Sequence, residues 1–311
     1  FEDLPLEGAR LPTMSIALAQ GAVPKPCAPR RMSPAVRGAI DEEVADLLAQ
    51  GVIRPSSSAY SSPIVMVGKK DGGKRMCVDY RSLNACTIDF RFPVPNTRDL
   101  LDRMGGKELF ATLDLRSGFH QVPLSEDSMH LTAFSTPLGL FEYTRLPFGL
   151  KNAPRYFQKQ MVSVLAGLEG TCCEVFIDDI IVYGEDVQSF LAHLRQVFER
   201  LREYNLRLKG TKCCFGQRSV EYLGHIVSGK GIELSATRKQ AIADIPPPTS
   251  MQKLRTFMGM ANYFRGFVEG YARLAKPLTG LCSTKAKFHW GEAEQRAFVA
   301  LKLAILQSPE L

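Results

Sequence analysis

The 311-residue sequence lacks several features that would place it in common classes of protein. No apolar run reaches the roughly 20 residues that a membrane-spanning helix needs, and the N-terminus lacks the charged-then-apolar layout of a signal peptide. The eight cysteines form neither a C-x-x-C pair nor a Cys/His zinc spacing. We therefore expect no membrane partner, no zinc site, and free thiols in a reducing compartment.

The composition is that of an ordinary globular chain with a basic bias. Hydrophobic residues make up 45% and charged residues 23%, which is enough for a sizeable core. The length allows one large domain or two to three smaller ones. The net charge of +7 favours a polyanionic partner, although many proteins without such a partner share this balance. Because the first residue is Phe1 rather than methionine, we expect an excised piece of a longer protein.

Two adjacent aspartates, Asp178 and Asp179, are the most informative feature. They separate two apolar β-branched runs, 175–177 and 180–182, which is the pattern of a tight hairpin with buried strands. Neighbouring carboxylates repel, and a purely structural turn usually recruits Gly or Asn instead. A cation would neutralise the pair, and an all-oxygen site suits Mg²⁺. An ordinary solvated Asp-Asp turn is the alternative.

Asp114 is the candidate for a third carboxylate. It lies at the end of a strand-like run, residues 109–115, just before a Ser-Gly break. An aspartate at the end of a strand can face a hairpin tip on the neighbouring strand. Two metal ions bridged by such carboxylates, typically about 3.5–4 Å apart, would clamp the attacking and leaving oxygens of a phosphoryl transfer.

A second predicted hairpin carries a cluster of cations. Alternating segments at 64–67 and 75–80 flank Asp71-Gly72-Gly73, and the four cations near the tip are Lys69, Lys70, Lys74 and Arg75. Such a cluster is self-repelling unless an anion lies within it, and a triphosphate or a nucleic-acid backbone would serve. The alternative is an edge strand blunted by lysines.

The remaining pattern predicts an α+β fold. Residues 1–32 are rich in Pro, Ala and Gly, which indicates a linker or an extended arm. The strand, hairpin, helix, strand-turn-strand, helix order in the middle of the chain gives an antiparallel sheet with helices on one face. Helices are expected after Ser33, near 97–104, after Asn152, after the Asp-Asp hairpin, after Ser235 and Ser250, near 271–281 and at 292–306; further strands are expected at 131–135, 141–146, 206–208, 213–215 and 219–227.

Seven segments of the sequence occur in the order that is known from one family. They are S-P-I-V-M-V, K-K-D-G-G-K-R-M-C-V-D-Y-R-S-L-N, L-D-L-R-S-G-F-H-Q, T-A-F-S-T, L-P-F-G-L-K-N-A-P, F-I-D-D-I-I-V-Y and V-E-Y-L-G-H-I-V-S. In these segments the chain resembles the reverse transcriptase of gypsy-type long-terminal-repeat retrotransposons, relatives of retroviral polymerases. The resemblance extends over nearly all of the chain from about Ser33 onward.

The resemblance implies a right-hand polymerase fold. It places an N-terminal arm or linker at 1–32, the fingers with the start of the palm at 33–113, and the palm at 114–227 with an inserted fingers segment near 120–150. A helical thumb follows at 228–285, and residues 286–311 would begin the connection to a ribonuclease H domain. No ribonuclease H carboxylate set is present in this sequence.

The resemblance also implies roles for individual residues. The metal-binding aspartates of the family fall on Asp114, Asp178 and Asp179. Lys69 and Arg75 would hold the incoming triphosphate. The aromatic residue that excludes a ribose 2′-hydroxyl falls on Phe119, for which a core phenylalanine is the alternative. The last two groups implied are Phe148 and Gly149, which would border the nucleotide pocket, and Tyr222, Leu223 and Gly224, which match the hairpin that grips the primer.

The activity implied is RNA- and DNA-templated DNA synthesis with two Mg²⁺ ions, Mn²⁺ being an alternative. Its partners would be an RNA template, a DNA primer–template duplex and dNTPs, in an intracellular, cytoplasmic virus-like particle; the oligomeric state stays open. The competing hypothesis is a domesticated or inactive copy that binds nucleic acid without polymerising. Such a relic should have lost a metal aspartate or a fingers cation, and all of them remain.

Overall fold

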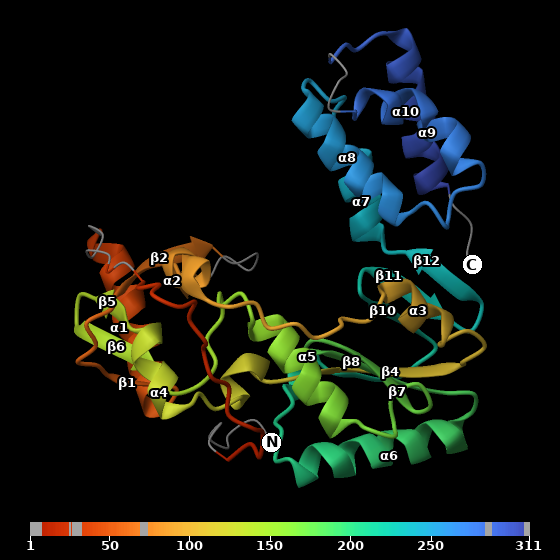
Figure 1. Cartoon of the computed structure of the whole chain (residues 1–311). Helices are drawn as coiled ribbons and strands as arrows, with labels where there is room; N and C mark the ends of the chain where they lie inside the picture. The colour runs from red at the N-terminus through yellow and green to blue at the C-terminus, as the bar shows by residue number, and fades with distance from the viewer. Residues whose placement is uncertain (1–7, 25, 27–32, 69–73, 284–287, 308–311) are drawn as a thin grey trace. The chain divides into compact units, whose positions relative to one another are not determined.

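A computed structural model describes residues 8–24, 26, 33–68, 74–283 and 288–307 (Figure 1). The chain forms two compact units. The larger comprises Phe1–Arg103 and Leu109–Gln217, and the smaller comprises Met104–Glu108 and Arg218–Leu311. None of the helices in the described ranges has the length and apolar character required to cross a membrane.

The larger unit contains two sheets and the helices that pack on them (Figure 1). In chain order its elements are α1 (Pro34–Ala49), β1 (Ile53–Pro55), β2 (Ser62–Gly68), β3 (Lys74–Val78), α2 (Arg81–Cys86), α3 (Thr97–Asp102), β4 (Leu109–Asp114), η1 (Gly118–Gln121), α4 (Glu126–Met129), η2 (His130–Thr132), β5 (Phe134–Thr136), β6 (Gly139–Tyr143), α5 (Ala153–Val164), β7 (Cys173–Phe176), β8 (Asp179–Gly184), α6 (Val187–Glu203), η3 (Gly210–Lys212) and β9 (Cys214–Gln217).

The first sheet has the strand order β1-β6-β5-β2-β3 and includes the predicted basic hairpin. Strands β2 and β3 pair antiparallel, with Met66 opposite Met76 and Gly68 opposite Lys74. The hairpin prediction is therefore confirmed up to this last pair, while its tip, residues 69–73, lies outside the described residues. Helix α1 begins at Pro34, whose fixed φ suits a first turn, and buries Ile40 and Val44 completely.

Side-chain hydrogen bonds shorten one predicted strand and interrupt another. The segment 131–135 begins as the turn η2, because the Thr132 hydroxyl donates to the Met129 carbonyl (2.6 Å), and β5 starts only at Phe134. The segment 206–208 makes only an isolated bridge. There the Gln121 amide accepts from the Arg207 N–H (2.8 Å) and donates to the Arg207 carbonyl (2.9 Å), which also accepts from the Arg116 N–H (2.9 Å), so a side chain takes the place of a continued strand ladder.

The second sheet, with the order β7-β8-β4-β9, is antiparallel throughout and carries the predicted aspartates. Alternate residues of its strands, such as Leu113 and Val182, join the same hydrophobic core as Met161 of α5 and Val197 of α6. Figure 1 shows α5 and α6 beside this sheet. The prediction of an antiparallel sheet packed against helices is confirmed.

The described part of the N-terminal arm is extended and integral to the larger unit. Met14 is 3% exposed; its N–H donates to the Pro123 carbonyl (2.9 Å), and its own carbonyl accepts from Ser125 (2.9 Å). The Tyr156 hydroxyl of α5 donates to the Thr13 carbonyl (2.9 Å). Of the two interpretations that the sequence left open for this segment, the structure favours an arm over a free linker.

The smaller unit consists of a three-stranded antiparallel sheet followed by helices. The segment 219–227, predicted as one strand, is a hairpin, because Leu223 (φ 50°) and Gly224 (φ 74°) turn the chain. Its helices begin after Ser235 and Ser250, as predicted, and both hydroxyls cap the following turn. The elements are β10 (Ser219–Tyr222), β11 (His225–Ser228), β12 (Gly231–Leu234), α7 (Ala236–Ala243), α8 (Met251–Tyr263), α9 (Tyr271–Leu281) and α10 (Glu292–Leu306).

Candidate active site

The β4–β8 pairing brings Asp114 and Asp179 together. They are the last register pair of the two strands, which are held side by side by the buried pairs Leu113–Ile180 and Ala111–Val182. Both aspartates therefore end at the same edge of the sheet, as the sequence predicted for a third carboxylate facing the hairpin.

The hairpin between β7 and β8 places Asp178 at its tip. Phe176 pairs with Asp179, so the loop consists of Ile177 and Asp178 alone. Ile177 adopts φ 58°, a left-handed conformation that is unusual for a β-branched residue. Asp178 is exposed and lines a cleft together with Asp114. Two strands that are buried in the core thus carry the carboxylates to a solvent-facing edge.

The negative charges at this sheet edge affect the pKa of Asp179. Partial burial of its carboxyl group raises the pKa of Asp179 to about 6, and the charges of Asp178 and Asp114 add to this, while Lys212 opposes it. The Lys212 ammonium lies 3.3 Å from Oδ2 of Asp114. The raised pKa means that the ionised form of Asp179 is disfavoured, and a bound cation would stabilise that ionised form.

The cleft beside the aspartates has a volume of about 610 Å³ and a mixed lining. Three cationic side chains line it. Arg116 follows β4, Lys209 directly precedes the turn η3, and Lys212 is the last residue of that turn. Its aromatic wall includes Phe148, which is 44% exposed. Cations, carboxylates and an exposed ring around one cleft suit a phosphorylated ligand that also carries a flat base.

The two predicted triphosphate-binding cations are only partly within the described structure. Lys69 lies outside the described residues. Arg75 is on β3, opposite Val67. Met76, Cys77 and Val78, which follow it on the same strand, line the cleft. The backbone of this hairpin therefore reaches the cleft that contains Asp114.

Phe119, Phe148 and Gly149 are neighbours. The Phe119 ring is 9% exposed, and its centroid lies 5.1 Å from that of Phe148 and 5.2 Å from that of Phe157. It therefore packs between the cleft wall and the core. Gly149 has φ 94°, and a Cβ there would lie 3.4 Å from the Val78 carbonyl oxygen, so the position favours glycine.

The predicted primer-gripping residues form the β10–β11 turn of the smaller unit. Tyr222 is 3% exposed, and Leu223 and Gly224 form a two-residue loop with both φ values positive. This is the conformation of a type I′ turn, in which glycine is favoured. A Cβ on Gly224 would lie 2.4 Å from Nε of Arg238, so a side chain cannot be added without moving the arginine.

Arg238 also fixes a buried histidine beneath this turn. Its guanidinium donates to Nε2 of His225 (3.1 Å), which also lies 3.0 Å from the Tyr263 hydroxyl. Burial lowers the pKa of His225 to about 4, and the Arg238 charge acts in the same direction, so the ring is neutral at pH 7. Because arginine only donates, Nε2 is an acceptor and the ring proton is on Nδ1.

The residues Gln158 and Lys212 contribute to the site but were not predicted. Gln158 lies on the buried face of α5, and its position three residues before Met161 was the available signal: a polar side chain on a buried face needs a partner. Lys212 belongs to a K-G-T-K segment whose distance in sequence from Asp114 gave no such signal.

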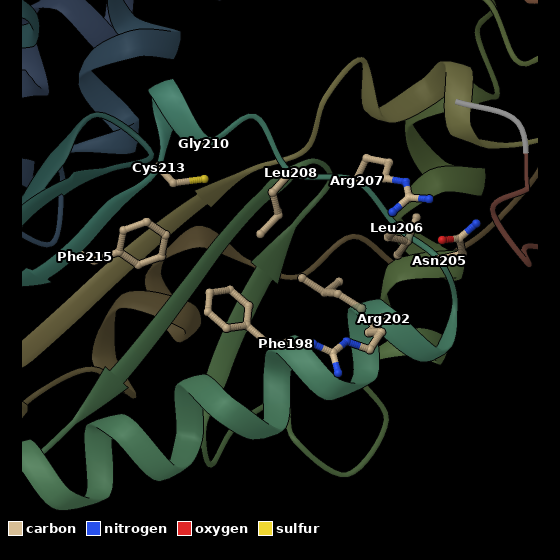
Figure 2. A pocket seen from close by; sticks show the side chains of 10 residues that line it. Phe198, Arg202, Asn205, Leu206, Arg207, Leu208, Gly210, Cys213 and Phe215 are labelled. Carbon is tan, nitrogen blue, oxygen red and sulfur yellow. The ribbon is translucent and has the colours of Figure 1, made fainter. Parts of the chain in front are cut away.

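An apolar cavity of about 370 Å³ adjoins the site and was also not predicted (Figure 2). Figure 2 shows Phe198 on α6 and, from the following segment, Leu208, Cys213 and Phe215 around it. The Asp114 backbone N–H donates to Sγ of Cys213 (3.4 Å). The wall of this cavity is therefore bonded to the strand that carries a predicted metal ligand.

The residues present fit a divalent cation in donor chemistry. Among the described residues, no three His, Cys, Asp or Glu side chains converge in the geometry of a metal site. Asp114, Asp178 and Asp179 nevertheless share one edge and supply only carboxylate oxygens, which are the ligands preferred by Mg²⁺. Burial is the main cause of the raised pKa of Asp179, and the charges of Asp178 and Asp114 raise it further.

Fold and site together define a polymerase-type nucleotidyl-transfer domain, with an acidic sheet edge beside a cationic cleft. A sequence model of the family described as reverse transcriptase (RNA-dependent DNA polymerase) matches residues 67–227, more than half of the chain. The chain belongs to the reverse transcriptase family.

Relatives among curated proteins include retrotransposon polyproteins of Drosophila melanogaster. The retrovirus-related Pol polyprotein from transposon opus is 44% identical over 251 residues, covering 79% of this chain and 25% of the relative. The corresponding polyprotein from transposon gypsy is 37% identical over 280 residues, covering 85% and 27%. The chain thus spans about a quarter of the length of these relatives, and the predicted gypsy-type resemblance is confirmed.

Solved structures confirm the fold. The foamy viral protease-reverse transcriptase dRH in complex with double-stranded DNA has a TM-score of 0.85 and 27% identity, covering 98% of this chain and 54% of that chain. The foamy viral protease-reverse transcriptase in complex with an RNA/DNA hybrid has a TM-score of 0.79 and 28% identity, covering 98% and 42%. The right-hand polymerase fold that was predicted is the fold of this chain.

Proposed function

We propose that this chain is an RNA- and DNA-templated DNA polymerase of a long-terminal-repeat retrotransposon, extending a primer 3′ end with dNTPs. The observation that carries the proposal is the pairing of Asp114 with Asp179 across β4 and β8, with Asp178 at the adjoining tip. Nucleotidyl transfer needs positioning and charge stabilisation rather than a nucleophilic side chain, so carboxylates and cations suffice.

The reverse transcriptase family generally depends on a divalent cation. In the proposal Asp114, Asp178 and Asp179 hold two Mg²⁺ ions, with Mn²⁺ as a substitute. When bound, these ions supply the positive charge that stabilises the attacking and leaving oxygens. The contribution of the chain is to hold carboxylate oxygens on two paired strands, so that little reorganisation is needed when substrate arrives.

The other predicted residues bind and orient the substrates. Lys69 and Arg75 of the β2–β3 hairpin hold the triphosphate. Phe119, supported by Phe148 and Phe157, presents a rigid surface toward the sugar and excludes a 2′-hydroxyl. The β10–β11 turn, in which Leu223 and Gly224 both have positive φ, steadies the primer through its backbone.

Nucleic acid is the proposed partner. The net charge of +7 favours a polyanion, and the similar foamy viral enzymes are bound to double-stranded DNA and to an RNA/DNA hybrid. We assign the larger unit to fingers and palm and the helices after Ser235 to the thumb. A cytoplasmic virus-like particle is the proposed location.

Primer extension tests the proposal. Wild type should extend a DNA primer on RNA and DNA templates with dNTPs and Mg²⁺, whereas Asp178→Asn should bind primer–template normally and extend nothing. Asp127→Asn is the matched control, because Asp127 is an exposed aspartate of α4, away from the three predicted ligands in sequence. Extension by Asp178→Asn would refute the site assignment. Binding without extension by wild type would favour the alternative, a copy that binds nucleic acid without polymerising.

A further inference from the structure

The two-residue loop that carries Asp178 is held in a conformation that its own sequence disfavours. Ile177 adopts φ 58° at the first loop position, where a two-residue hairpin usually has Gly, Asn or Asp. A β-branched side chain makes this region still less accessible. Something outside the loop must therefore hold Ile177 in place.

Gln158 of α5 supplies that restraint from beneath the hairpin. Its side-chain oxygen accepts a hydrogen bond from the Ile177 N–H (2.5 Å), and its side-chain nitrogen donates to the Val175 carbonyl (3.2 Å). One amide thus spans the end of β7 and the first loop residue. Its orientation follows from its partners, because a backbone N–H only donates and a carbonyl only accepts.

The Gln158 amide is completely buried and cannot exchange its partners for water. Gln158 is 0% exposed, and Phe157 and Met161 on the same helix are also completely buried. A buried amide that gives up its two bonds would be left unsatisfied, as would the Ile177 N–H. Because α5 is fixed in the core, the two hydrogen bonds of Gln158 fix the position of the loop relative to α5.

We propose that Gln158 is a positioning residue that sets the location of Asp178 and Asp179 by locking Ile177. The inference rests on the proposed function, in which the locked loop holds the carboxylates where they bind the cations. Without Gln158, Ile177 can relax to an ordinary negative φ, which swings the peptide that leads into Asp178. A displacement of about 1 Å in a catalytic group can cost about 100-fold in rate.

Substitutions at Gln158 separate this role from simple packing. Gln158→Leu removes both hydrogen bonds and keeps an apolar side chain in the buried site. Gln158→Glu keeps the acceptor for Ile177 and loses the donor to Val175. Gln160→Leu is the matched control, because Gln160 is 3% exposed on the same helix.

Suppression by glycine is the most specific test. Glycine adopts a positive φ without strain, so Ile177→Gly should make the lock unnecessary. In primer extension, Gln158→Leu should lower kcat by about 100-fold with the primer–template Kd unchanged, and the same change in the Ile177→Gly background should cost only a few-fold. Equal kcat for Gln158→Leu and Gln160→Leu would overturn the proposal, as would an equal loss in both Ile177 backgrounds.

A readout that is independent of synthesis separates this inference from the proposed function. Mn²⁺ binding, followed by electron paramagnetic resonance, should weaken about tenfold in Gln158→Leu and remain at the wild-type value in Gln160→Leu. If wild type binds Mn²⁺ but does not extend primers, the proposed function fails while this titration still decides the role of Gln158. If Gln158→Leu does not fold, Gln158→Asn decides, because its amide is one methylene shorter and cannot make both bonds: an unchanged Mn²⁺ affinity and kcat would overturn the proposal.

Discussion

The ammonium group of Lys212 lies 3.3 Å from Oδ2 of Asp114, at the same sheet edge as Asp179. Both side chains of this ion pair are solvent-accessible, with 58% and 37% of their surfaces exposed. The lysine partly neutralises an aspartate that the proposed function assigns to a metal ion. Protein cation and metal cation thus compete for one carboxylate, and the competition can be measured.

Removal of Lys212 should strengthen cation binding. We expect Lys212→Met to raise the affinity for Mn²⁺ several-fold, because Asp114 loses its internal counter-ion, while the free energy of unfolding falls by only about 0–1 kcal/mol, as for an exposed ion pair. Mn²⁺ titration and urea unfolding check these values. Lys209→Met is the control, since Lys209 lines the same cleft. A lower Mn²⁺ affinity specific to Lys212→Met would contradict the competition.

Truncation of Phe119 should admit ribonucleotides. We expect Phe119→Ala to raise the rNTP to dNTP ratio of kcat/KM by about tenfold or more, because the surface that faces the 2′-position is removed. The same change should cost about 3–5 kcal/mol of stability, since the ring packs on Phe148 and Phe157. The ratio is independent of the fraction of folded enzyme. Phe157→Leu serves as the control for packing loss, and an unchanged ratio in Phe119→Ala would return Phe119 to a purely structural role.

Glu174 should make the larger unit more stable in mild acid. Burial raises its pKa to about 7 from an ordinary 4.5, although Arg103 and the Tyr183 hydroxyl oppose the shift. The folded state therefore holds this proton more tightly than the unfolded chain. The stabilisation is complete below pH 4.5 and is lost as the pH rises through about 7.

Glu174→Gln should remove that pH dependence. The difference in unfolding free energy between wild type and Glu174→Gln should shift by about 3 kcal/mol in favour of wild type as the pH falls from above 7 to 4.5. Urea unfolding at several pH values measures it. Glu203→Gln, at a carboxylate that is 67% exposed, provides the baseline. Parallel curves for wild type and Glu174→Gln would show that the pKa of Glu174 is the same in the folded and unfolded states.

The N-terminal arm should contribute to stability as a core element. We expect Met14→Ala to lower the free energy of unfolding by about 2–5 kcal/mol, because Met14 is 3% exposed against the larger unit. Thr13→Ala, at an exposed neighbour, should change it by less than about 0.5 kcal/mol. Chemical denaturation distinguishes the two. Equal stability of both variants would mean that the arm can detach without loss.

Local pattern was sufficient for most of the secondary structure. The buried stripe of α5, the Ser caps of α7 and α8 and the paired β7 and β8 runs follow from spacing alone. The failures have a common cause. At Thr132 and Arg207 a side chain satisfied the backbone where a strand was expected, and at Leu223 a non-glycine residue adopted a positive φ. None of these choices is encoded in hydrophobic periodicity.

The sequence by itself determined the family and the fold class, and it predicts the three aspartates of the site, because motif order and residue type are properties of the linear chain. Only the tertiary structure decided what surrounds them. Asp114 meets Lys212 across 98 positions of sequence, and Gln158 reaches Ile177 across 19. Contacts of this kind depend on which strands pair and how a helix seats in the core, and these are set by the packing of the whole unit rather than by any local run of residues.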